Sequence, residues 1–281
     1  MLDSLRSESP MFSIRMRARF PFALLVLWIA AASPARPHAT TLHATHQYDG
    51  VPRYSVIVWP SGPSIETANS LVAQFNSAKT FYDQFDVAEK IVELHDRSVL
   101  PELEPWLVSE DMHARGNASF IFAKFGDDRG FESIRKILED RSTSTKRTVF
   151  ESYSNGQPSL QSQIRQDRYY AAHLFGDLKD ARAVPILVAL LNDEDVSWIA
   201  PWSLGEIGDK SAIPALTAEL GNASPDRRVL AIDALVQLNA KEALPQIRAL
   251  LDDKDKIHFD TLGTVGDAAK TAVAKLEETP Q

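Results

Sequence analysis

The chain has no cysteine among its 281 residues, and this absence excludes several classes of protein at once. Without a thiol there is no disulfide framework, no thiolate metal site, no cysteine nucleophile and no lipid-modified cysteine near the N-terminus. Cysteine-free chains suit reducing and oxidising compartments equally, so the absence does not locate the protein.

Short catalytic motifs are missing as well. The sequence contains no phosphate-binding loop, no dinucleotide fingerprint, no Gly-x-Ser-x-Gly elbow and no His-Glu-x-x-His metal motif. His95, His173 and His258 have no second histidine four residues on, so we expect structural roles for them. We therefore predict no catalytic residue, no cofactor site and no metal site.

The charge balance is acidic, with a formal net charge of −8. Residues 1–35 contain four of the arginines and only two acids, so the remaining chain is more acidic still. An acidic body argues against a nucleic-acid groove and against binding to an anionic membrane. Hydrophobic content of 44% and charged content of 24% are typical of an ordinary globular protein.

The N-terminus predicts a cleaved signal peptide over residues 1–35. Arg15, Arg17 and Arg19 precede an apolar run over residues 20–32, and small residues follow at 33–35. As a helix this run is about 20 Å long, short of the ~30 Å bilayer core, so a membrane anchor is less favoured. We expect export to a periplasm or out of the cell.

Residues 36–77 read as an extension or linker. Proline recurs in it at positions 37, 52, 60 and 63. Residues 54–59 (YSVIVW) are β-branched and aromatic enough for a short strand, and a helix could span residues 64–77.

A sequence motif recurs along the second half of the chain. Residues 205–214 (GEIGDKSAIP) are similar to residues 176–185 (GDLKDARAVP), 29 positions earlier. Residues 241–245 (KEALP) repeat the last part of this motif. A recurrence of this length predicts stacked helical hairpins.

The recurring residues are suited to helix starts. An apolar helix pattern follows each proline, and an Asp five positions earlier can accept the free amides of a helix start. The proline positions are Pro101, Pro185, Pro214 and Pro245, with Glu132 in the equivalent place. The aspartates are Asp96, Asp127, Asp180 and Asp209.

These features resemble the HEAT-repeat family, in the short bacterial form called phycobilisome-lyase HEAT-like repeats. The resemblance covers residues 81–276, about five and a half repeats, and is best over residues 164–252. It implies an all-α, right-handed α-solenoid of about five to six hairpins, spanning residues 78–281. A polar insertion at about 141–164 departs from the pattern, and residues 257–276 look like a terminal cap.

Some enzymes share this repeat. Deoxyhypusine hydroxylase resembles the array but uses His-Glu pairs for iron, and here no His precedes a Glu. Nothing marks a bilin site either. A lyase-like or metal-dependent enzyme, or its accessory subunit, stays the alternative, as does a purely structural spacer.

Two acidic clusters, residues 193–195 (DED) and 252–255 (DDKD), could in principle hold calcium. They fall in the expected turns between repeats. We therefore expect them to be solvated turns that cap the following helix.

One column of the aligned repeats is unusual. Positions that the family usually leaves polar and exposed carry rings here in repeats two to four. The candidate partner-binding residues are Phe120, Tyr169, His173, Trp198 and Trp202. Stacked repeats should bring Trp198 and Trp202, four residues apart on one helix face, beside Tyr169 and His173.

The sequence therefore predicts an exported scaffold that binds another protein through one face of a solenoid. We expect no nucleic-acid partner and no membrane contact beyond the signal peptide. Coverage of the ring column by residues 36–77 or by the insertion stays open, as do the partner and the oligomeric state.

Overall fold

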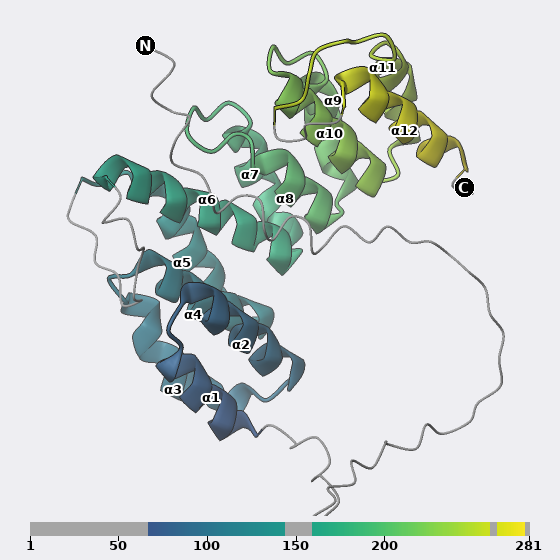
Figure 1. Cartoon of the computed structure of the whole chain (residues 1–281). Helices are drawn as coiled ribbons and strands as arrows, with labels where there is room; N and C mark the ends of the chain where they lie inside the picture. The colour runs from purple at the N-terminus through teal and green to yellow at the C-terminus, as the bar shows by residue number, and fades with distance from the viewer. Residues whose placement is uncertain (1–66, 144–158, 259–262, 279–281) are drawn as a thin grey trace, which may run out of the picture. The chain divides into compact units, whose positions relative to one another are not determined.

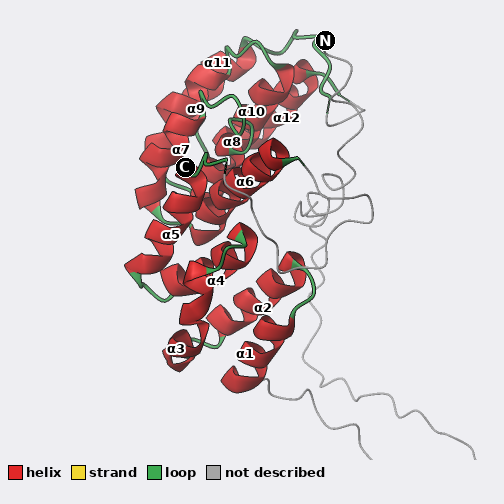
Figure 2. Ribbon diagram, turned by 90° about the vertical axis from the view of Figure 1, so that its left-hand side faces the viewer, coloured by secondary structure: helices red, strands yellow, loops and turns green. Residues whose placement is uncertain are grey.

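A computed structural model describes residues 67–143, 159–258 and 263–278 (Figure 1). These residues form helices joined by turns, and Figure 2 shows no strand among them. Their one β feature is an isolated antiparallel bridge between Lys256 and Thr264. The predicted all-α solenoid is confirmed. The predicted signal peptide, the predicted strand at 54–59 and most of the insertion lie outside the described residues.

The helices alternate between two layers, which we call the first-helix and second-helix layers. Neighbouring members of the first-helix layer contact one another along the whole array. This layer comprises α2 (Phe81–Glu93), α4 (Met112–Lys124), α6 (Leu160–Leu178), α8 (Ala200–Ile207), α10 (Pro225–Gln237) and α12 (Val265–Glu278). The second-helix layer comprises the shorter α3 (Leu100–Leu103), α5 (Asp128–Glu139), α7 (Val184–Leu190), α9 (Ile213–Glu219) and α11 (Leu244–Arg248).

The recurring Asp and Pro residues start the second helices, as predicted. Each Asp accepts a hydrogen bond from the amide two residues on, which satisfies a donor that the helix cannot. In most repeats a 3₁₀ turn follows, and then an α-helix with Pro in its first turn. Proline is tolerated there because its missing amide has no helical acceptor.

The helical array begins earlier than residue 78. Helix α1 (Ala68–Ser77) is capped by Thr67 and buries Leu71, Val72 and Phe75 while packing against α2. At the other end, α12 carries exposed Asp267 and Lys270 on its outer side, as expected of a terminal repeat.

The insertion is shorter than the sequence suggested. Helix α6 already begins at Leu160, because Ser159 caps it by accepting from the amide of Ser162. Residues 160–164, expected to belong to a polar loop, therefore add more than one turn to the longest first helix. Residues 144–158 lie outside the described part.

Candidate partner-binding site

Four rings, two from α6 and two from α8 and the turn before it, form one strip on the first-helix layer. Tyr169 stacks on Trp198, with ring centroids 4.4 Å apart and planes at 19°. His173 stacks on Trp202 at 4.2 Å and 26°. The two pairs are linked by Tyr169 and His173, whose centroids lie 6.4 Å apart. We call these four residues the aromatic strip, and its predicted assembly is confirmed.

The aromatic strip is half-buried. All four side chains fall between fully buried and exposed, and the His173 side chain is 30% exposed. Burial raises the pKa of Tyr169, and its hydroxyl is therefore neutral at physiological pH. Asp177, one turn after His173, places Oδ2 2.9 Å from the imidazole Nδ1.

Phe120 does not belong to the aromatic strip, contrary to the sequence prediction. It is only 4% exposed, and its ring packs 5.0 Å from that of Phe85 between α4 and α2. Lys124 lies over its ring at 5.4 Å. Phe85, on the neighbouring first helix α2, covers the ring that the alignment had placed on an exposed face. Phe120 is a core residue.

Small residues bring α6 and α8 close enough for their rings to stack. A Cβ at Gly176 would lie 3.0 Å from the Trp202 ring and 3.0 Å from the Ser203 Cα. Ser203, fully buried, donates its hydroxyl to the backbone carbonyl of Ala172 at 2.9 Å. The two helices approach closely because Gly176, Ala172 and Ser203 are small and add almost no bulk between the two backbones.

Trp198 is held by a turn and not by the helix that the sequence predicted. Helix α8 begins at Ala200, so Trp198 lies in the preceding turn and Trp202 in the first turn of the helix. Pro201 stands in that same first turn, where its missing amide costs nothing. Pro201 therefore interrupts no hydrogen bond within α8.

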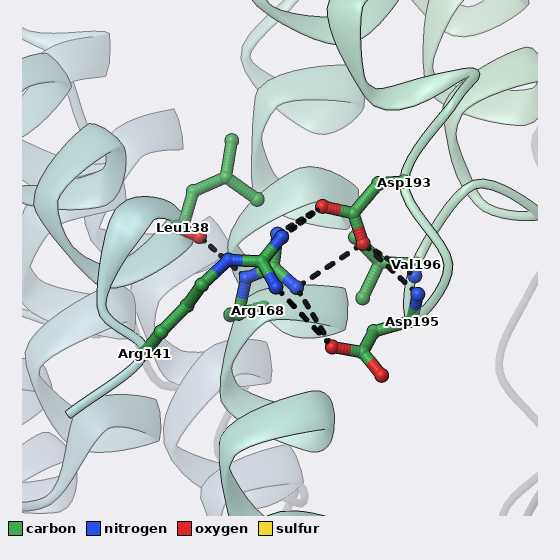
Figure 3. A network of polar contacts seen from close by, with 6 residues as sticks. All are labelled: Leu138, Arg141, Arg168, Asp193, Asp195 and Val196. Atoms are coloured by element: carbon green, nitrogen blue, oxygen red, sulfur yellow. Dashed lines mark hydrogen bonds and ion pairs between the residues drawn. The ribbon is translucent and has the colours of Figure 1, made fainter. Parts of the chain in front are cut away.

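A buried arginine fixes the turn that leads to Trp198 (Figure 3). Arg168, next to Tyr169 on α6, has a side chain only 3% exposed. Its guanidinium bonds both oxygens of Asp193 and lies 3.3 Å from Asp195, while its Nε donates to the Leu138 carbonyl at 2.8 Å. Exposed Arg141 adds a second guanidinium to the same carboxylates.

The acidic cluster at 193–195 is thus an ion-pair site and not a solvated turn. Asp193 Oδ1 also accepts hydrogen bonds from the backbone amides of Asp195 and Val196, so the carboxylate fixes the conformation of the turn in which it lies. Burial opposes ionisation of Asp193, but these hydrogen bonds and the Arg168 charge outweigh it and lower its pKa.

The same arrangement recurs, which the sequence reasoning missed. Arg115 and Arg228 occupy the position of Arg168 in their repeats and donate to the carbonyls of Ser109 and Asn222. Arg228 also contacts Asp253 and Asp255, the second acidic cluster. The recurring Arg in the aligned first helices was the signal that could have revealed these pairs.

Repeat four breaks this pattern. Ser197 stands where the arginine should be, and Arg227 of the next helix reaches back instead. It donates to the carbonyl of Leu191 and pairs with Glu219 at 2.6 Å. Every turn between the described repeats is therefore tied to an arginine.

A second ring cluster lies on α2, α4 and α6, and no sequence signal singled it out. The His113 ring is 4.6 Å from that of Phe81 and 4.9 Å from that of Tyr170. His113 Nδ1 lies 3.3 Å from an oxygen of Asp167, with only 17% of its own side chain exposed. Burial lowers the pKa of His113 to about 4, although the Asp111 charge opposes the shift.

The lowered pKa of His113 predicts that the folded chain loses stability on acidification. Its pKa is lower in the folded chain than in the unfolded chain, so between about pH 6.5 and 4 the unfolded state binds more protons. The free energy of unfolding should fall by about 2 kcal/mol from pH 7 to pH 4.5 through this group. Urea titrations at both pH values measure the change.

Replacing His113 shows how much of the pH dependence of stability comes from this residue. His113→Asn should remove most of this pH dependence, whereas His258→Asn, at a side chain 75% exposed, should leave it intact. An unchanged slope in His113→Asn would exclude His113 as its source.

Across residues 67–143, 159–258 and 263–278, no three His, Asp or Glu side chains gather as a metal site would require. Among the same residues, no helix is both long enough and apolar enough to span a bilayer.

Comparisons with known proteins agree with the repeat pattern. Residues 159–228 match HEAT repeats, and residues 228–253 match the PBS lyase HEAT-like repeat. No curated protein sequence matches the chain. Similar solved structures include an engineered protein (18% identity, TM-score 0.40, covering 75% of this chain and 96% of its own). A designed armadillo repeat protein is also similar (16%, 0.39, 75% and 100%). Residues 159–253 are thus similar to HEAT repeats, over the part of the chain where the repeat pattern is clearest.

Proposed function

We propose that this chain is an exported scaffold that binds another protein through the aromatic strip. The observation that carries the proposal is the pair of ring stacks, Tyr169 on Trp198 and His173 on Trp202, at positions the repeat usually leaves polar. The HEAT-repeat fold supports it, because stacked repeats present an extended surface for recognition.

The geometry suits protein recognition for an energetic reason. Stacked rings are already ordered, so little side-chain entropy is lost when a partner covers them. Tryptophan and tyrosine are also the residues that contribute most to protein interfaces. Because the rings of each pair stack nearly face to face, they offer mainly their edges to a partner.

Export is the second part of the proposal. The arginines before the apolar run at 20–32, and the small residues after it, support a cleaved leader. N-terminal sequencing of the protein from the exported fraction should begin near residue 36. A mature protein that retains residues 1–35 would contradict a cleaved leader.

The binding prediction concerns the two tryptophans. Crosslinking in the exported fraction should first identify the partner, and calorimetry should then measure its Kd for the purified chain. Trp198→Ala with Trp202→Ala should weaken binding at least 30-fold, because each anchor at the centre of an interface contributes about 2 kcal/mol.

The matched control is Trp106→Ala, which changes a half-buried tryptophan outside the aromatic strip. It should leave the Kd unchanged, and circular dichroism should show that all variants stay helical. Equal losses in both variants would point to general destabilisation. No loss in either would place the binding surface elsewhere.

A further inference from the structure

We infer that the partner binds with an arginine, whose guanidinium lies between the outer face of the Trp202 ring and the Asp233 carboxylate. This inference rests on the proposed function of the aromatic strip and names the chemistry of the partner's anchor. The two residues belong to neighbouring first helices, α8 and α10, at the end of the aromatic strip. We call the surface between them the guanidinium site.

The packing of α10 on α8 repeats the packing of α8 on α6. A Cβ at Gly176 of α6 would lie 3.0 Å from the Ser203 Cα. One repeat later, a Cβ at Gly205 of α8 would lie 3.2 Å from the Ala234 Cα. In both pairs the glycine lets the next first helix approach closely. Equivalent positions of the three helices are therefore related by the same step along the array.

This step places Asp233 beside Trp202. Trp202 precedes Ser203 and Asp233 precedes Ala234, so both hold the same position in their repeats. His173 stacks on the face of Trp202 that is turned toward α6, with centroids 4.2 Å apart. The opposite face is turned toward α10, where the short Asp233 side chain stands in place of a further ring. Asp233 is exposed and Trp202 half-buried, so a partner can reach both.

The charge of Asp233 is only partly compensated within the chain. Desolvation by the surrounding helices raises the pKa of Asp233 to about 6, and the opposing charge of Lys275 does not cancel this shift. Glu206, one turn after Trp202, differs because Lys179 lies 3.8 Å from its carboxylate. At neutral pH Asp233 is mostly ionised, so a cation brought by the partner stabilises a charge that its surroundings disfavour.

An arginine suits this site better than a lysine. Its guanidinium is planar, so it can stack on an indole and at the same time donate hydrogen bonds to a carboxylate. A lysine ammonium is a compact and strongly hydrated charge, which loses more on leaving water. The acidic balance of the chain also attracts a basic segment from solution.

A short peptide tests the guanidinium site without the partner. Acetyl-Gly-Arg-Gly-amide is titrated into the purified chain labelled with ¹⁵N, and NMR follows the indole N–H signal of Trp202, assigned with Trp202→Phe. We expect a saturable shift with a Kd in the millimolar range, and about fivefold weaker binding of acetyl-Gly-Lys-Gly-amide. A Trp202 signal that does not move, or an equal Kd for the two peptides, would overturn the inference.

Asp233→Asn removes the charge and keeps the size of the side chain. It should weaken binding of the arginine peptide about fivefold. Asp226→Asn, on the same helix, is the matched control, because Asp226 already accepts a hydrogen bond from the His258 amide at 2.7 Å. The control should leave the Kd unchanged. An unchanged Kd in Asp233→Asn, or equal losses in the two variants, would contradict a specific pairing with Asp233.

The inference and the proposed function can fail independently. Once the partner is identified, Asp233→Asn should weaken its binding about tenfold. If Trp198→Ala with Trp202→Ala weakens the partner but Asp233→Asn does not, the aromatic strip binds it without an arginine and only the inference fails. If the arginine peptide binds as expected but the tryptophan variants leave partner affinity unchanged, the proposed function fails and the guanidinium site remains.

Discussion

Arg168→Ala is expected to lower the free energy of unfolding by about 3–5 kcal/mol. The substitution leaves Asp193, a side chain 8% exposed, without its main counter-charge, and removes the donor to the Leu138 carbonyl. Buried charges that lose their partner are expensive because water cannot replace it. Since a domain has only about 5–15 kcal/mol in total, the change should be visible as a large shift in the urea midpoint.

Arg141→Ala provides the matched control. Arg141 contacts the same two carboxylates, but its side chain is 59% exposed. Exposed ion pairs contribute only about 0–1 kcal/mol, so the loss should be several-fold smaller. Equal losses in the two variants would mean that burial of Arg168 is not the cause.

Acidification should weaken the same Arg168–Asp193 ion pair by protonating the carboxylate. The pKa of Asp193 is lower in the folded chain, so its stabilisation is complete above about pH 4 and disappears as pH falls through the folded pKa. In Arg168→Ala the acid-sensitive part contributed by Asp193 should shrink. The variant should also loosen the turn that carries Trp198, so partner affinity should fall along with stability.

The sequence predicted the features that recur in every repeat. It did not predict those that depend on contacts between residues far apart in the chain. Helix starts follow from local chemistry, which is why Asp180 and Pro185 occupy their expected roles. The proximity of Tyr169 and Trp198 followed from alignment, since equivalent positions of stacked repeats lie side by side, whereas the stacking of their rings is seen only in the structure. No comparable rule covered Phe120, because its burial depends on Phe85 of another repeat.

Charges were the harder part to predict. The turn at Asp193 was taken for a solvated acidic cluster because its partner, Arg168, lies 25 positions away and across a hairpin. The expectation that Trp198 and Trp202 share one helix is wrong for a similar reason. Residues 193–199 form turns tied to Asp193, and helix propensity alone gave no sign of this.

Asn117→Ala is the second variant expected to have a large effect, about 3 kcal/mol of destabilisation. Asn117 is fully buried in α4 and joins three helices. Its amide donates to the Phe81 carbonyl and to Gln84 Oε1, each at 2.9 Å, and its oxygen accepts from the Tyr170 hydroxyl. Alanine removes all three contacts and leaves a small cavity between the helices.

The chain offers a control in the same tripeptide. Asn117 and Asn222 each begin an Asn-Ala-Ser sequence, but Asn222 lies in a turn, where it accepts from the Ser224 amide at 2.9 Å. Asn222→Ala should therefore cost only about 1 kcal/mol. Asn222 also donates to Glu219 Oε2 at 3.2 Å, so a similar cost at both positions would show that the network of Asn117 contributes no more than local hydrogen bonds of a turn.

A double-mutant cycle with Tyr170→Phe tests the network directly. Tyr170 belongs to α6, so its bond to Asn117 ties the second ring cluster to the helix that carries the aromatic strip. If the pair is coupled, Asn117→Ala with Tyr170→Phe should cost about 1 kcal/mol less than the sum of the single changes. Additive losses would mean that each residue stabilises the array separately.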